Sequence, residues 1–288
     1  MRETETFVES AVAPLTAKTG LGPLYLGHHV LGLAAIFLGL LTLSWRDFNI
    51  WEQIRPLGNI PHREILACLI GILELLAGLA IQWQRTARAG ALVLTGVFLS
   101  FTLLWIPRAL TTPLAWDPWG NFFEQSSQVA GALIAYASFD QRDSLLAARL
   151  NRFAYITFGI CVFAFLFGHL PVTCKCDVRG LIPGWLPPGK MFWAVTTTLA
   201  FPLASIALLS GRLALLAARL LTAMIVVIGL LVWLPAPFTH PFADQHTNWA
   251  GNGVNLAIGA AAWIVGDLLK RKSVQKAVPP QAVAGVPA

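Results

Sequence analysis

Glu74 is the most chemically informative residue of this 288-residue chain because it stands alone in a long apolar sequence. It is the fourth residue of GILELLAGL, residues 71–79, and lies about ten residues into a segment of the roughly twenty that cross a bilayer. A carboxylate at that depth costs several kcal/mol unless it is paired, hydrated or protonated. Two interpretations follow: a proton carrier that contacts a quinone or an ion, or a protonated acid bonded to a neighbouring helix.

Cys174 and Cys176 form a second candidate site, a Cys-x-Cys pair with Lys175 between them. A disulfide across so short a loop is strained and relatively oxidising, which suits thiol exchange. Two thiolates with nearby histidines could instead bind a soft metal such as copper or zinc. A third interpretation is a structural disulfide that involves Cys68. The motif is less specific than Cys-x-x-Cys, and no thioredoxin-like βαβ pattern surrounds it.

Histidine and aspartate side chains near the same loops are candidate metal ligands. His169 lies five residues before Cys174, and the last long loop contains His240, Asp244 and His246. These are ligand types that zinc and copper accept. The alternative is that they are solvated loop residues, with His169 at a helix end.

The sequence does not favour other cofactors. His28 and His29 are adjacent, so they would point about 100° apart on a helix, and no histidine stands at a matching depth to complete a haem site. The sequence also contains no phosphate-binding glycine motif, nucleophile elbow or dinucleotide fingerprint.

The composition places these residues in a membrane protein. Apolar residues make up 56% of the chain and charged residues 12%, and the mean hydropathy is +0.66. No segment alternates with period two, and backbone groups in lipid must be satisfied internally, so the spans should be helices. The sequence predicts an all-α bundle of eight transmembrane helices, of which the fourth is the weakest because it is short and begins with polar residues. Their approximate ranges are 24–45, 64–83, 89–107, 123–139, 153–170, 191–210, 213–234 and 249–268.

The distribution of Lys and Arg predicts the orientation. With a cytoplasmic N-terminus, thirteen of these residues face inward and seven outward, and 270–272 is the strongest inward cluster. We therefore expect both termini in the cytoplasm of a bacterial cell and the protein in the inner (plasma) membrane. The net charge of +6 fits this asymmetry beside anionic lipid rather than nucleic-acid binding. Residues 1–23 should form a cytoplasmic N-terminal segment, and 269–288 a disordered basic tail.

The chain contains the same helical unit twice. Pro61 and Pro187 open equivalent stretches 126 positions apart, and Pro107 and Pro235 end them 128 positions apart, each two residues after a Trp. The sequence predicts two four-helix repeats, 24–139 and 153–268, joined by a cytoplasmic linker at 140–152. Because four is even, the repeats should be parallel and related by an axis along the membrane normal.

The fourth helix of each repeat carries a stripe of polar and small residues on one face. Such a stripe either packs against other helices or lines a ligand cavity. The two stripes are Glu124, Gln128, Gly131 and Ala135, matched by Asn248, Asn252, Asn255 and Gly259.

These landmarks resemble the DoxX-like family of small four-helix membrane proteins. PGWLPPGKMFWA, residues 183–194, is similar to the family's loop into its second helix, and residues 71–79 are similar to its glutamate-bearing second helix. Trp233-Leu234-Pro235 resembles the end of the third helix. The resemblance covers nearly all of residues 24–268 as two tandem units. It implies a scaffold, and its named member is a subunit linked to thiosulfate oxidation and quinone reduction. This chain departs from the family in fusing two units and in having Ala200 near the position of Glu74.

Together these features predict membrane redox chemistry linked to thiols and quinone on the outer face, with Glu74, Cys174 and Cys176 as catalytic candidates. If the protein is an enzyme, it should be a subunit of a membrane oxidoreductase. Its expected partners are the lipid bilayer, a quinone and an extracytoplasmic redox protein. The alternatives are a small-solute transporter built from parallel repeats and a non-catalytic membrane scaffold.

Overall fold

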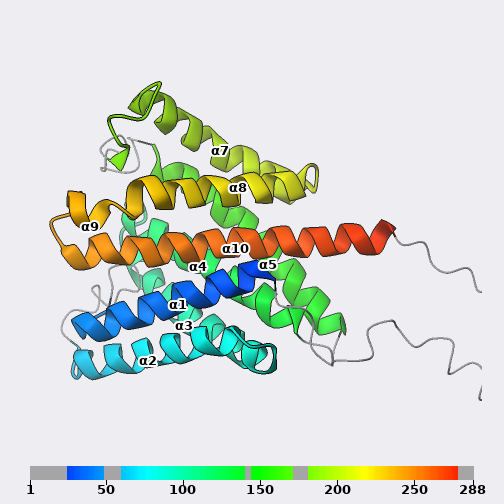
Figure 1. Cartoon of the computed structure of the whole chain (residues 1–288), viewed down its shortest axis with the longest axis horizontal. Coiled ribbons are helices and arrows are strands. Elements are labelled where there is room, and N and C mark those ends of the chain that lie inside the picture. Colours follow the sequence, from blue (N-terminus) through cyan, green and yellow to red (C-terminus); the bar gives the residue numbers. More distant parts are fainter. Residues whose placement is uncertain (1–24, 49–59, 140–143, 171–180, 278–288) are drawn as a thin grey trace, which may run out of the picture.

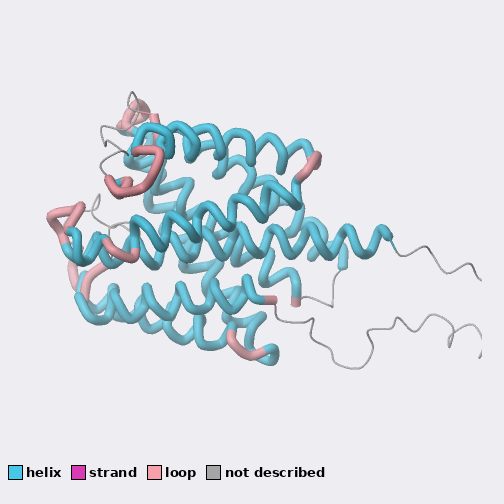
Figure 2. The backbone as a smooth tube through the Cα atoms, turned by 45° about the horizontal axis from the view of Figure 1, so that its top comes forward, coloured by secondary structure: helices cyan, strands magenta, loops and turns pink. Residues whose placement is uncertain are grey.

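The computed structural model describes residues 25–48, 60–139, 144–170 and 181–277, and every regular element in these ranges is a helix (Figure 2). The π-helical η3 (Gly229–Trp233) and the one-turn α9 (Ala236–Thr239) follow α8. The all-α prediction is therefore confirmed for the described residues. The long helices are α1 (Leu26–Trp45), α2 (Arg63–Ile81), α3 (Gln84–Thr111), α4 (Trp116–Ser138), α5 (Ser144–Gly168), α7 (Lys190–Ser210), α8 (Ala214–Ile228) and α10 (Gln245–Ala277).

Seven of the described helices are long and apolar enough to cross a membrane. They are the long helices other than α4, with α8 counted together with its continuation to Thr239. Many Leu, Ile, Val and Phe side chains on these helices are exposed around the bundle, as a lipid environment requires. The structure is thus that of a multi-pass helical membrane protein.

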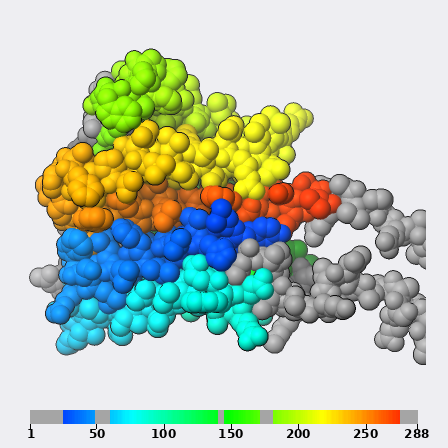
Figure 3. Space-filling view, in the orientation of Figure 1, coloured from blue at the N-terminus to red at the C-terminus, as the bar shows by residue number. Residues whose placement is uncertain are grey.

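The helices run side by side along the bundle, with α10 crossing its middle between α8 and α1 (Figures 1 and 3). Sequence neighbours pack together, from α1 through α4 and again from α5 through α10. Three further contacts join these sets: α4 with α5, α10 with α1, and α4 with α10. One end of the bundle carries α9 and is called the α9 end. Helix α10 finishes at the opposite end, which is called the Arg271 end.

Helix α4 lies inside the bundle, against α3, α5 and α10. Its consecutive polar residues Gln125, Ser126, Ser127 and Gln128 are all buried. A helix that is covered by other helices does not need an apolar surface toward lipid. This shielding explains why the fourth segment has the weakest hydropathy in the sequence.

Helices α1 and α2 approach each other through glycines. A Cβ added to Gly39 would lie 2.5 Å from the carbonyl oxygen of Gly71, and one added to Gly78 would lie 2.5 Å from that of Gly32. The two glycines of each helix are seven residues apart, close to two turns, so both contacts fall on one face. In lipid, where apolar burial drives association weakly, such close backbone packing holds helices together. Glu74 is fully buried in this same interface.

Two helices extend beyond the spans predicted for them. Helix α5 begins at Ser144, so most of the predicted linker 140–152 is helical, and its sequence SLLAARLNR is rich in good helix formers. Helix α10 continues to Ala277, so the predicted disordered tail 269–288 is helical in its first part. The Arg271 guanidinium secures this extension: it donates to Ser138 Oγ at 2.9 Å and lies over the Tyr25 ring. Residues 1–23 and 278–288 lie outside the described residues.

The α1–α2 interface should not tolerate a methyl group at Gly39. We expect Gly39→Ala to lower the free energy of unfolding by about 1–3 kcal/mol, because the added Cβ overpacks a backbone contact. The matched control is Gly96→Ala in α3, where a Cβ meets no atom within 4 Å, and which should be neutral or stabilising by up to about 1 kcal/mol. Thermal unfolding in detergent measures both, and equal midpoints would contradict the proposed packing.

Candidate functional site

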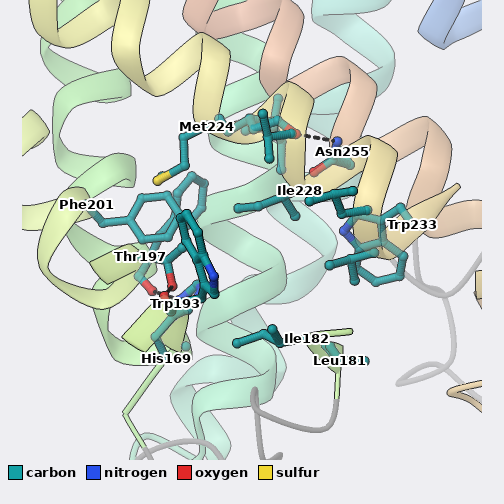
Figure 4. A pocket seen from close by; sticks show the side chains of 18 of the residues that line it. His169, Leu181, Ile182, Trp193, Thr197, Phe201, Met224, Ile228, Trp233 and Asn255 are labelled. Atoms are coloured by element: carbon teal, nitrogen blue, oxygen red, sulfur yellow. Dashed lines mark hydrogen bonds between the residues drawn. The ribbon is translucent and has the colours of Figure 1, made fainter. Parts of the chain in front are cut away.

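A pocket of about 600 Å³ opens toward the α9 end of the bundle, between α4, α5, α7, α8, η3 and α10 (Figure 4). Its size falls in the range of small-molecule binding sites. Most of the wall is aliphatic or aromatic. The aromatic residues are Trp116, Phe165, Trp193, Phe201 and Trp233, and the polar ones are Glu124, His169, Thr196, Thr197 and Asn255.

The pocket exists because α7 is held to α5 mainly near the Arg271 end. There Ser205 Oγ donates to the Gly159 carbonyl oxygen at 2.8 Å, and the Tyr155 hydroxyl donates to the Leu208 carbonyl oxygen. Toward the α9 end α7 tilts away from the bundle (Figure 1). Side chains replace backbone contact in this region: Phe201 packs edge-to-face on Phe165 at 5.6 Å.

An irregular turn of helix forms another wall. In η3 the Leu234 N–H donates to the Gly229 carbonyl oxygen, five residues back, at 2.7 Å. Pro235 and Pro237 have no N–H, so the carbonyls four residues before them lose their helical partners. Asn252 Nδ2 replaces one of these donors, at 2.7 Å from the Trp233 carbonyl oxygen. Single π turns occur frequently at functional sites, and this one lines the pocket.

His169 supplies a hydrogen-bond acceptor at the end of α5. Its Nδ1 lies 3.0 Å from the Phe165 carbonyl oxygen, and because a carbonyl can only accept, Nδ1 carries the proton and Nε2 is left as an acceptor. Burial lowers the pKa of His169, and the hydrogen bond to Phe165 opposes this shift. The imidazole is therefore neutral at neutral pH, with its ring 4.9 Å from that of Phe201.

Glu124 reaches the pocket from α4. Its Oε2 atom is buried and has no hydrogen-bond partner among the described residues. On α10, Asn255 Nδ2 donates to the Ile225 carbonyl oxygen at 3.1 Å. Both residues belong to the polar stripes found in the sequence, so these positions line a cavity. Gly131 of the same stripe serves packing, since a Cβ there would lie 2.6 Å from that of Ala261.

The predicted catalytic residues are only partly placed. Glu74 is fully buried between α1 and α2 and does not line this pocket. Cys174 and Cys176 lie outside the described residues. His169, five residues before Cys174, and Leu181, five residues after Cys176, both line the pocket.

The predicted metal ligands have other roles where they are described. Asp244 accepts from the His246 N–H at 3.1 Å and from Thr247 Oγ1 at 2.9 Å, and so caps the start of α10. His246 stacks on Trp45 with ring centroids 4.9 Å apart, and His240 contacts Gln245. Among the described residues, no three His, Cys, Asp or Glu side chains are grouped to hold a metal ion.

Sequence reasoning missed several residues of the pocket. Trp116 and Trp233 lie at helix ends, where tryptophans are typical of the aromatic belt of a membrane protein, and Trp193, Thr197 and Phe201 carried no signal in the sequence. The polar stripe was the signal that pointed to Glu124 and Asn255.

Comparisons with protein-family models, with curated proteins and with solved structures gave no match. The resemblance to the DoxX-like family therefore stays a prediction, and the candidate site is defined by geometry alone.

The burial of His169 should make stability depend on pH. The folded state disfavours the imidazolium, so His169 has a lower pKa in the folded protein than in the unfolded chain, where it is about 6.5. The unfolded chain therefore binds more protons at acidic pH, and stability is lost as the pH falls through about 6.5. We expect His169→Gln to flatten this loss in thermal unfolding measured from about pH 7.5 to pH 5. The same substitution at the exposed His240 is the control, and identical profiles for wild type and His169→Gln would refute the burial argument.

Proposed function

We propose that this protein binds a lipophilic ring compound of the quinone class in the pocket and takes part in thiol- and quinone-linked redox chemistry of the membrane. The observation that carries the proposal is the pocket itself: an apolar cavity between apolar helices, with aromatic walls and a few polar groups. A flat ring with polar substituents and an apolar tail matches such a cavity.

We also propose that α4 is an eighth span and that the bundle consists of two parallel four-helix repeats. The packing supports this arrangement. The last helix of each proposed repeat contacts the first helix of the other, α4 with α5 and α10 with α1, and the two last helices contact each other. Burial of α4 by its neighbours accounts for its low hydropathy. The basic residues 270–272 then favour a cytoplasmic Arg271 end, with the α9 end and the pocket toward the outside.

The redox partner of the ring would be a dithiol, either Cys174 with Cys176 or one on an extracytoplasmic protein. In such a reaction two S–H bonds break and one S–S bond forms. The two electrons and two protons convert the two quinone carbonyls into hydroxyls, so no further oxidant is needed. The sequence supports this pairing, since the Cys-x-Cys loop is flanked by pocket residues.

A carrier of a small solute is the second candidate, and the interrupted helix at η3 favours it. Irregular membrane helices beside a cavity are common in transporters. The apolar lining argues for a lipophilic ligand, which crosses bilayers without a carrier. Uptake of a polar solute into proteoliposomes that was blocked by filling the pocket would favour the carrier instead.

Trp193 should contribute to ring binding. We expect Trp193→Leu to weaken the binding of a short-chain ubiquinone analogue by roughly 3–10-fold, the usual worth of one aromatic contact. Calorimetric titration of the full chain in lipid nanodiscs measures the affinity. Trp185→Leu is the matched control, because Trp185 is 71% exposed and does not line the pocket. An unchanged affinity in Trp193→Leu, or no binding by wild type, would sink the proposal.

The cysteine pair should respond to quinone. The chain has four cysteines, and the two outside the predicted pair are Cys161, which is buried, and Cys68, which is half-buried. The double variant Cys68→Ser/Cys161→Ser therefore keeps only the predicted pair. In that variant, we expect quinone to protect two thiols from maleimide labelling and a mild reductant to restore them. Labelling that is indifferent to quinone would rule out a role of this pair.

A further inference from the structure

The wall of the pocket is exposed along one edge. Among the lining residues that the structure describes, all are buried or half-buried except Thr196 of α7 and Ala223 and Val227 of α8. Val227 is 49% exposed. Because Ala223 and Val227 are four residues apart, they lie on the same face of α8. The three residues mark an edge of the pocket between α7 and α8, which is called the lateral opening below.

The course of α7 and α8 explains the lateral opening. The two helices are joined by a turn at Gly211, whose φ of 72° lies in the left-handed region. From this turn the helices diverge toward the α9 end (Figure 1). Thr196 and Ala223 are small. Met224, which follows Ala223 and borders the cavity (Figure 4), has an unbranched side chain that adapts to its neighbours. Small or adaptable side chains therefore stand at this edge of the pocket.

The lateral opening lies on a surface that suits lipid. Helix α7 has no charged residue after Lys190, and α8 has none after Arg219. Thr196 is six residues from Lys190, which is about 9 Å along the helix axis. The exposed side chains next to the opening, Val195 and Val226, are apolar. A ligand dissolved in the hydrocarbon of a bilayer can therefore reach the opening without passing through water.

Polar groups are unevenly distributed around the cavity. Glu124, His169 and Asn255 come from α4, the end of α5 and α10, whereas the pocket-lining residues of α8 are all apolar. A cavity of about 150 Å³ is enough for one benzene ring, and the pocket has about 600 Å³. The pocket can therefore hold a ring near its polar groups together with the first part of an apolar chain beside α8.

We propose that the ligand is a lipid with a ring head group and a single long apolar chain, that it enters the pocket sideways from the bilayer, and that its chain leaves through the lateral opening. The inference rests on the proposed function for the ring, and on the exposure of Thr196, Ala223 and Val227 for the opening. It narrows the ligand class to long-chain molecules that reside in the membrane.

The chain arm of the test compares a ubiquinone ring without a tail with its decyl derivative, in the full chain in nanodiscs and with concentrations expressed per lipid. Val227→Trp should weaken binding of the decyl derivative by about tenfold, because the indole fills the path of the chain. Binding of the tail-less ring should not change, which also shows that the variant is folded. Val226→Trp is the matched control, since Val226 is 40% exposed on the same helix but does not line the pocket.

A second pair of variants repeats the comparison from α7, in case Val227→Trp does not fold. Thr196→Trp should weaken binding of the decyl derivative, and Val195→Trp, at an exposed position that does not line the pocket, should not. Unchanged affinity in the opening variants, or an equal loss for both ligands, would overturn the placement of the chain. Failure of wild type to bind either ligand would overturn the proposed function instead.

The lipid arm needs no quinone, so it tests the lateral opening even if the proposed function fails. A bimane label is attached at Ile258→Cys, on the α10 wall of the pocket, after the four native cysteines are replaced by Ser. Lipids brominated on the chain should quench the label, and iodide in water should not. Val227→Trp should reduce the lipid quenching severalfold, whereas Val226→Trp should leave it unchanged. Quenching by iodide alone, or lipid quenching that Val227→Trp does not alter, would overturn the lateral opening.

Discussion

Hydrogen bonding inside lipid is the constraint on which the rest of this structure depends. Water does not solvate polar groups there, so each must find a partner within the protein or be covered by it. The fold meets this demand by placing its most polar long helix, α4, among α3, α5 and α10. It meets it again at η3, where two prolines remove backbone donors and Asn252 supplies one for the Trp233 carbonyl. The same rule makes the buried Glu124 Oε2 atom informative, because it borders the pocket and has no hydrogen-bond partner among the described residues.

The difference between the two helix pairs α1–α2 and α5–α7 follows from residue size. Gly39 against Gly71 lets two backbones touch, and no room for a ligand is left between them. At the other pair, Gly159 meets the side chain of Leu209, and aromatic rings fill the space further along. Helix α7 is consequently attached near one end and diverges toward the other. The cavity beside α7 needs no special motif, because the α5–α7 pair lacks the glycine contacts that close the α1–α2 interface.

Much of the scaffold could be predicted from the sequence. The segment predicted at 191–210 is α7, Lys190–Ser210, because apolar length and flanking Gly and Pro mark a helix that lipid surrounds. Helix α4 was harder, since its start at Trp116 is polar and its burial depends on neighbours distant in the chain. The landmarks Trp105-Ile106-Pro107 and Trp233-Leu234-Pro235 each predicted the end of a helix. In the structure, Pro107 lies inside a continuous α3, whereas the π turn η3 ends at Trp233, two residues before Pro235.

The contrast between Glu74 and Glu124 shows why the candidate site was predicted less well than the fold. Glu74 was conspicuous because its neighbours in sequence are apolar, and that reasoning identifies a costly residue without showing what can reach it. The structure encloses Glu74 between two helices in glycine contact. Glu124 was less conspicuous because polar residues surround it in the sequence, yet it belongs to the α4 stripe and lines the cavity. Access, rather than the cost of burial, therefore separates the two carboxyl groups: Glu124 borders a cavity of ligand size, and Glu74 does not.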